Sequence, residues 1–184
     1  MMKTRTTLQV VTLIVLFVVA RVSSAQTGTA VPPAVVDSWS YLIGDWNVEG
    51  RVGSTPVNGS ATFDLAEGKY CYVGRQVWRI GENGRSLHLS LIGGWDSAAN
   101  ETIEQGFSSS GDAATVHYRQ PAERANVIEG RIDGVSGPGQ RWAGTIKLQR
   151  NGPDEFLLTT TIDDEIVHSL KYVRKQGDHG TAIK

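Results

Sequence analysis

The sequence predicts an all-β protein, an antiparallel up-and-down barrel of about ten strands with one short helix before it. Beyond Trp46, apolar and polar residues alternate with a period of two, which is typical of half-buried strands. Turn-forming residues recur about every ten residues, and 21 glycines in 184 residues suit a turn-rich fold. The connections are too short for crossovers, so successive strands are expected to pair as hairpins and to close into a barrel without exposed edges.

The N-terminus resembles a secretory signal. Lys3 and Arg5 precede an apolar run of about 13 residues, and Ser23-Ser24-Ala25 supplies the small residues that a signal peptidase requires. The run is shorter than the roughly 20 residues that cross a membrane, and the single cysteine, Cys71, lies far from the cleavage position of a lipoprotein. We therefore expect a signal peptide over 1–25, a secreted or periplasmic protein, and no stable membrane insertion.

The charge of the mature chain argues against nucleic acid as a partner. The full chain has 18 Lys and Arg against 19 Asp and Glu. Residues 1–25 contain three of the basic residues and none of the acidic ones, which leaves 15 against 19, or a net charge of −4. A basic face for nucleic acid or anionic lipid is therefore not expected.

The mature chain divides into a lead-in, a barrel and a tail. Residues 26–34 are polar and proline-containing, 35–175 form the barrel domain with its helix, and 176–184 form a loose polar tail. Apolar residues at steps of three and four predict the helix over 35–43. The expected strands are 46–53, 57–65, 70–80, 86–95, 101–108, 113–120, 126–132, 141–149, 155–162 and 166–174.

The start of the predicted sheet resembles lipocalins and other calycin barrels. Gly44-Asp45-Trp46 is similar to the Gly-x-Trp motif that opens their first strand after a short helix. The resemblance implies that Trp46 plugs the closed end of the barrel and that a basic residue of the last strand lies across its ring, which here is Arg174, with Lys175 as the alternative. Gly44, Trp46 and Arg174 are thus expected to be structural residues. The chain lacks the lipocalin disulfide and the second loop motif.

A later pair of motifs resembles an uncharacterised family of exported bacterial lipocalin-like proteins. Gly93-Gly94-Trp95-Asp96 and the run from Gly106 to Gly111 carry this likeness, which extends over most of 40–175. The resemblance implies the barrel fold and no particular activity.

A barrel of this size either holds one small ligand or is filled by its own side chains. We expect an exported protein that binds a small, largely apolar molecule. The side chains predicted to face the interior and contact it are Phe63, Arg75, Trp78, Leu89, Glu104, Val116, Tyr118, Phe156, His168 and Leu170. For the charged Arg75 and Glu104 the more common arrangement is the alternative one, in which they face water on the outer side of the barrel. An interior without a cavity of roughly 300 Å³ would instead favour a packed barrel that acts through surface contacts with other proteins.

His168 supports an alternative, haem binding. Ile166, Leu170 and Tyr172 alternate with it and are apolar, so His168 is expected to face inward. Haem-binding barrels of the nitrobindin type carry their iron-ligating histidine late in the chain on such a strand, and His168 is the position most similar to it. A buried, hydrogen-bonded core histidine explains the same pattern, and the flanking nitrobindin motifs are absent.

Catalysis has little support in the sequence. The nucleophile elbow, the zinc-protease helix, the phosphate-binding glycine loop and the Cys-x-x-Cys pair are all missing. An enzyme would require Arg75, Glu104 and His168 to meet within hydrogen-bond reach. We therefore predict no catalytic residue and no metal site, and lean against an enzyme.

Overall fold

The computed structural model describes residues 30–82, 84–119 and 125–176. The predicted signal peptide, most of the lead-in and the tail beyond Gln176 lie outside these residues. The chain divides into two units, Met1–Ala30 and Val31–Lys184, and the strands belong to the second.

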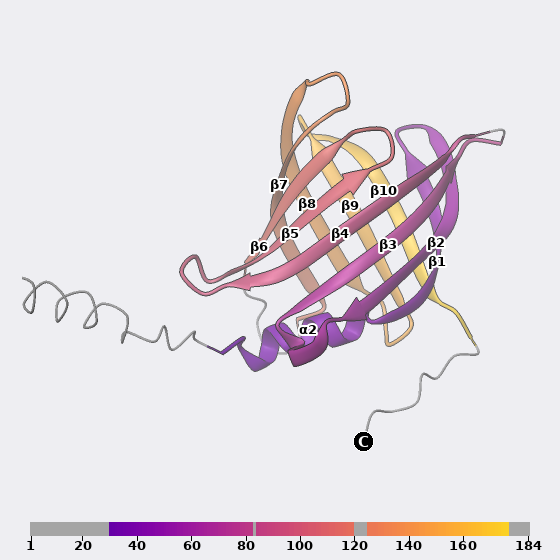
Figure 1. The fold of residues 1–184 in the computed structure, drawn as a ribbon. Coiled ribbons are helices and arrows are strands. Elements are labelled where there is room, and N and C mark those ends of the chain that lie inside the picture. The colour runs from indigo at the N-terminus through magenta and orange to yellow at the C-terminus, as the bar shows by residue number, and fades with distance from the viewer. Residues whose placement is uncertain (1–29, 83, 120–124, 177–184) are drawn as a thin grey trace, which may run out of the picture. The chain divides into compact units, whose positions relative to one another are not determined.

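The second unit is a closed barrel of ten antiparallel strands (Figure 1). Each strand pairs with its neighbours in sequence, and the first pairs with the last. In order, the strands are β1 (Gly44–Val52), β2 (Thr55–Leu65), β3 (Cys71–Ile80), β4 (Ser86–Asp96), β5 (Glu101–Ser108), β6 (Ala113–Arg119), β7 (Val127–Val135), β8 (Arg141–Arg150), β9 (Glu155–Ile162) and β10 (Glu165–Arg174). The predicted fold class is confirmed.

The helix α2 (Pro33–Leu42) lies against the end of the barrel where β1 begins (Figure 1). It starts at Pro33 rather than at Val35, because proline is well accommodated in the first helical turn, where its missing N–H leaves no hydrogen bond unmade. Val35 and Trp39 are buried, and both belong to the main core cluster. A single turn of 3-10 helix, η1 (Glu67–Lys69), connects β2 to β3 at the same end.

Trp46 and Arg174 seal the end of the barrel beneath the helix. Trp46 is fully buried, and the guanidinium carbon of Arg174 lies 4.2 Å from the centroid of its ring. Arg174 also donates to the carbonyls of Tyr41 and Ile43, and the Trp46 indole donates to that of Leu42. The carbonyls at the end of α2, which no helical N–H can reach, are therefore satisfied by β1 and β10.

Gly44 makes this arrangement possible. Its φ of +123° lies in a region that favours glycine, and a Cβ there would lie 2.7 Å from Nη1 of Arg174. The contact between Trp46 and Arg174 that the lipocalin resemblance implied is thus present, with Gly44 making room for the guanidinium group.

Candidate functional site

The interior of the barrel contains a cavity of about 410 Å³ that opens at the end away from α2. Turns β5–β6 and β7–β8 and the start of β10 lie at this open end, which we call the mouth (Figure 1). A smaller void of about 50 Å³ lies deeper, beneath Trp39 and Leu42 of the helix. The larger volume falls within the range of small-molecule sites, about 300–1,000 Å³. A barrel packed solid with its own side chains is therefore not what the structure contains.

Glu104 of β5 lines both the cavity and the deeper void. Its Oε2 accepts a hydrogen bond of 2.6 Å from the hydroxyl of Tyr72 on β3. Burial raises the pKa of the Glu104 carboxyl above its ordinary value, and the Tyr72 hydrogen bond opposes that rise. Glu104 is thus an acidic group held in an apolar interior, where it can bind a polar group of a ligand.

A second polar cluster is built around Gln76. Its Oε1 accepts hydrogen bonds from the hydroxyl of Tyr172 at 2.8 Å and from the indole of Trp78 at 3.1 Å. Desolvation by burial raises the pKa of Tyr72, Tyr118 and Tyr172, so these phenols stay neutral. The three tyrosines contribute aromatic surface to the interior without adding charge.

His168 lines the cavity and meets Trp78 edge to face, with ring centroids 6.0 Å apart. Burial lowers the pKa of the imidazole, which favours its neutral form. A β-bulge between Ile166 and His168 shifts the register of β10 against β9. The bulge turns Val167 and His168 toward the cavity, and it leaves Ile166 on the outer surface with 61% of its area exposed.

Most side chains predicted to face the interior do so. Trp78, Leu89, Val116 and His168 line the cavity. Phe63, Tyr118 and Phe156 line the deeper void, and Glu104 lines both. Leu170 is buried in the core cluster and lines neither space. The expectation that Ile166 shares the inward face of His168 is wrong, because a strict alternation cannot anticipate the bulge.

Arg75 does not face the interior, contrary to the prediction from the sequence. Its side chain is 72% exposed on the outer face of β3 and pairs with Asp64 at 3.0 Å. Its neighbours Gly74 and Gln76 are buried, so Arg75 points away from the cavity. Water solvates a guanidinium group far better than an apolar interior does. Arg75, Glu104 and His168 therefore do not converge, and the enzymatic arrangement that required all three is not formed.

Several residues that line the interior were not predicted from the sequence. Tyr72 and Gln76 supply polar contacts there, and Thr160 forms part of the wall of the cavity. The alternation in β3 carried the signal, because Tyr72, Gln76 and Trp78 share one side of the strand with Gly74. A glutamine on the same side as two aromatic residues indicates a buried polar contact.

Hydrogen bonds between neighbouring segments brace the mouth. Oδ1 of Asp112, in turn β5–β6, accepts from the backbone N–H of Gly137 in turn β7–β8 at 2.8 Å. Ser108 and Ser110 also donate to the Asp112 carboxylate, and these contacts lower its pKa. The backbone N–H of Ser109 joins its turn to β4 by donating to the carbonyl of His88. The two turns and β4 thus hold one another around the entrance.

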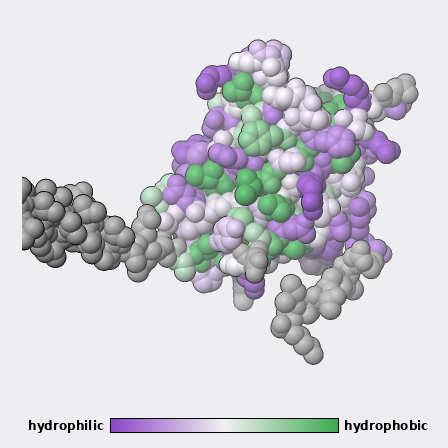
Figure 2. Space-filling model, viewed as in Figure 1, coloured by the Kyte–Doolittle hydropathy of each residue, from purple (hydrophilic) through white to green (hydrophobic). Residues whose placement is uncertain are grey.

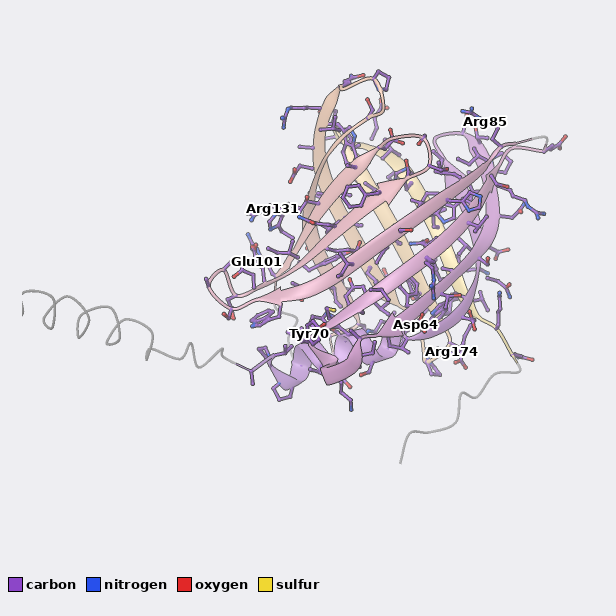
Figure 3. All side chains as sticks on the ribbon, in the orientation of Figure 1. Asp64, Tyr70, Arg85, Glu101, Arg131 and Arg174 are labelled. Atoms are coloured by element: carbon purple, nitrogen blue, oxygen red, sulfur yellow. The ribbon has the colours of Figure 1, made fainter. Side chains whose placement is uncertain are left out.

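The outer surface carries its own charged and apolar groups. Glu101 contacts His117 at 3.2 Å and Arg131 at 3.1 Å on the outside of β5 to β7, and Figure 3 shows Glu101 and Arg131 beside each other. In Figure 2, hydrophobic residues, coloured green, cluster on the face of the barrel that β3 to β5 form in Figure 1. Ile92 and Phe107 are the most exposed apolar side chains of β4 and β5.

Metal clusters and membrane-spanning helices are both absent from the described part of the chain. In the ranges 30–82, 84–119 and 125–176, no group of three or more His, Cys, Asp or Glu residues is arranged to hold a metal ion. Within the same ranges, no helix has the length and apolar character needed to span a membrane.

Solved structures similar to this chain are β-barrels. The crystal structure of Rv2717c from M. tuberculosis aligns with a TM-score of 0.58 and 15% identity, covering 79% of this chain and 99% of that one. A de novo designed fluorescence-activating β-barrel aligns with a TM-score of 0.45 and 18% identity over 76% of this chain and 98% of its own. A redesigned barrel, mFAP1, solved bound to DFHBI, aligns with a TM-score of 0.41 and 12% identity over 74% and 97%.

Comparison of the amino-acid sequence with known proteins finds no relative of this chain. No protein-family profile matches the chain, and no curated protein matches it. At 15% identity, the likeness to Rv2717c establishes a shared barrel fold. What the interior does must therefore be argued from its own geometry.

Proposed function

We propose that this protein binds one small, largely apolar molecule inside the barrel, admitted through the mouth. The cavity of about 410 Å³ carries the proposal. Its wall is mainly aliphatic and aromatic, and a few polar side chains are placed within it, which is the usual character of small-molecule sites. Pre-formed walls suit binding, because little side-chain entropy is lost when a ligand enters.

The test is to fill the cavity and measure binding of the neutral apolar dye Nile red. Ala114 lines the cavity, so Ala114→Trp places an indole where a ligand would lie. Ala143 is exposed on β8, so Ala143→Trp adds the same side chain outside. We expect saturable dye fluorescence with the wild type and with Ala143→Trp, and affinity at least about tenfold weaker with Ala114→Trp.

Two results would contradict the proposal. Equal dye binding by both tryptophan variants would place the dye on the outer surface. Failure of Nile red to bind the wild type, together with a native mass spectrum that contains only the bare chain after gentle purification, would argue against an occupied interior.

Haem is a second candidate ligand, favoured by the position of His168 at the cavity. A neutral imidazole is the form that binds iron, and burial favours that form here. His168 would hold the iron, and Trp78 with its aliphatic neighbours would enclose the macrocycle. Bound haem would supply redox and gas-binding chemistry.

Haemin titration tests this candidate. A Soret band that appears at one equivalent with the wild type, persists in His88→Ala and is lost in His168→Ala would support it, since His88 is exposed on β4. Equal bands in all three proteins would indicate adventitious binding.

Export and a calycin relationship complete the proposal. The basic residues, apolar run and small residues of 1–25 support cleavage before Gln26. The Gly44-x-Trp46 motif with Arg174 across the indole supports a relationship to calycins. N-terminal sequencing of the protein recovered from outside the cytoplasm should begin at Gln26, whereas an intact Met1 there would contradict cleavage.

A further inference from the structure

We propose that the preferred ligand is an apolar amine, whose cationic nitrogen binds the Glu104 carboxylate inside the barrel. This inference rests on the proposed function, and it specifies the polar group of a molecule that would otherwise be described only as small and apolar.

The first observation is the unused bonding capacity of Glu104. Tyr72 donates to Oε2, and among the described residues no other hydrogen bond reaches this carboxyl. The side chain is half-buried, and it lines both the cavity and the deeper void. Its remaining lone pairs are therefore directed at the space that a ligand would occupy. An ammonium group has three donors and no acceptor, so it matches a carboxylate oxygen of this kind.

The second observation is the sign of the charges around the interior. Among the residues that line the two spaces, Glu104 and Asp112 are acidic, His168 is the one weak base, and neither lysine nor arginine occurs. Burial also favours the neutral form of His168. A carboxylate or phosphate group buried within these spaces would lose its hydration shell without gaining a cation in return, which is strongly unfavourable.

The third observation is the aromatic character of the wall. Tyr72, Trp78, Tyr118 and Tyr172 each line one or both spaces. The face of an aromatic ring attracts a cation, and this attraction grows when water is excluded. The polar atoms of Trp78 and Tyr172 are already bonded to Gln76, so their rings rather than their donors are available to a ligand.

The pKa of Glu104 is coupled to the binding of a cation. Burial raises this pKa because the interior disfavours an unpaired negative charge, and an ammonium group beside the carboxyl would lower it again by stabilising the carboxylate. The titratable groups that interact with Glu104 are Tyr72, Tyr118 and Tyr172, and all three stay neutral at physiological pH. Among the residues that line the deeper void, Glu104 is therefore the acidic group with which a cation can pair.

The experiment compares three ligands that share one apolar skeleton. Naphthylmethylamine, naphthylmethanol and naphthylacetic acid are titrated calorimetrically into the wild type, Glu104→Gln and Glu129→Gln. Glutamine keeps the shape of the side chain and removes its charge. Glu129 is exposed on β7, so its variant is a matched control for the loss of one carboxylate.

We expect the wild type and Glu129→Gln to bind the amine more tightly than the alcohol and the acid most weakly. A charge-assisted hydrogen bond in a buried site corresponds to a change of about tenfold or more in affinity. Glu104→Gln should therefore weaken amine binding at least about tenfold while leaving the affinity for the alcohol within about threefold of the wild type. Retained alcohol binding also shows that this variant is folded.

Different failures separate the inference from the proposed function. If the alcohol binds as well as the amine, or if Glu104→Gln weakens both equally, the amine preference is overturned and a neutral apolar ligand remains. Tightest binding of the acid overturns it as well. If none of the three ligands binds while Nile red does, the inference fails alone, whereas failure of all four probes overturns both.

Discussion

His168 sits where its charged form is disfavoured, and this has a consequence for stability. The imidazole lines the interior beside Trp78, and burial lowers its pKa from the ordinary 6.5. An unfolded chain therefore takes up a proton near pH 6.5 that the folded chain refuses until a lower pH. Stability consequently falls as pH decreases from 6.5 toward the folded pKa, because protons bind preferentially to the unfolded state.

The first prediction concerns this pH dependence. His168→Gln should flatten the fall in the free energy of unfolding between about pH 7 and pH 5, measured by urea denaturation at several pH values. The exposed His88 provides the control, and His88→Gln should keep the wild-type slope. Glu104, whose pKa is raised, acts in the opposite direction and is present in all three proteins. An unchanged slope in His168→Gln would show that the imidazole is not held neutral by burial.

For single residues, the sequence predicts whether most side chains point inward or outward, but it predicts few of their hydrogen bonds. Phe63, Trp78 and Leu89 follow simple alternation, so their inward orientation can be predicted. Arg75 has apolar neighbours at alternate positions, but those neighbours are outer-face valines, and Val73 is itself exposed. Alternation assigns residues to two faces without stating which face is the inner one. The hydrogen bonds of Tyr72 with Glu104 and of Tyr172 with Gln76 join strands that are not consecutive in the chain, so alternation within one strand does not predict them.

The C-terminal end of the helix α2 is held in place by a residue of the last strand, β10. Arg174 of β10 covers the Trp46 ring and donates to two carbonyls at the helix end. It also pairs with Asp154 at 3.1 Å in the turn before β9. One side chain therefore joins the helix, β1 and a turn on the closed end.

The second prediction removes that side chain. Arg174→Met keeps much of the apolar stem but loses the cation over the indole and the donors to the helix carbonyls. It should lower the free energy of unfolding by about 2–4 kcal/mol, measured by chemical denaturation. Amide exchange in α2 should accelerate at the same time. Lys175→Met alters an exposed neighbour and should cost little, and equal losses in both variants would contradict the special role of Arg174.

The strands approach one another closely at particular glycines. A Cβ on Gly144 of β8 would lie 2.1 Å from the carbonyl oxygen of Thr161 on β9. A side chain of any size therefore forces the two backbones apart at this point. Gly94 of β4 differs, because its nearest neighbour would lie 3.8 Å away, an ordinary contact distance.

The third prediction compares these two glycines. Gly144→Ala should lower the free energy of unfolding by at least about 2 kcal/mol, whereas Gly94→Ala should stay within about 0.5 kcal/mol of the wild type. Thermal and urea denaturation would both report the difference. Equal tolerance would mean that β8 and β9 separate at little cost.

The element boundaries were predicted well, since turn-forming residues mark them. The strands β5 and β9 begin and end at the predicted residues, 101–108 and 155–162. The bulge in β10 was not predicted, because the adjacent apolar residues Ile166 and Val167 do not show that one of them is an additional residue in the strand.

The whole barrel depends on one pairing that is distant in sequence. Nine of the ten strand contacts join consecutive strands, and only β1 with β10 closes the ring. Closure was expected from the absence of long crossovers and from the cost of exposed edges. The size of the cavity could not be predicted, because it depends on how side chains from many strands share the interior.

The fourth prediction tests closure. A chain ending at Asp163 lacks β10 and exposes the edges of β1 and β9. It should lose cooperative unfolding and self-associate, as measured by denaturation and by light scattering. A chain ending at Gln176 retains every described strand and should unfold like the full chain. Cooperative unfolding of the shorter chain as a monomer would show that an open sheet is stable without its last strand.

The meeting of β1 and β10 at the closed end also decides where attachments can be made. The backbone N–H of Lys175 donates to the carbonyl of Asp45 at 2.9 Å, so the barrel begins and finishes beside the helix, opposite the mouth. A linker joined at Val31 or Gln176 would therefore start from the sealed side. A surface-immobilised or fused version of this protein would therefore hold its mouth toward the solution, and the attachment would not obstruct the entrance.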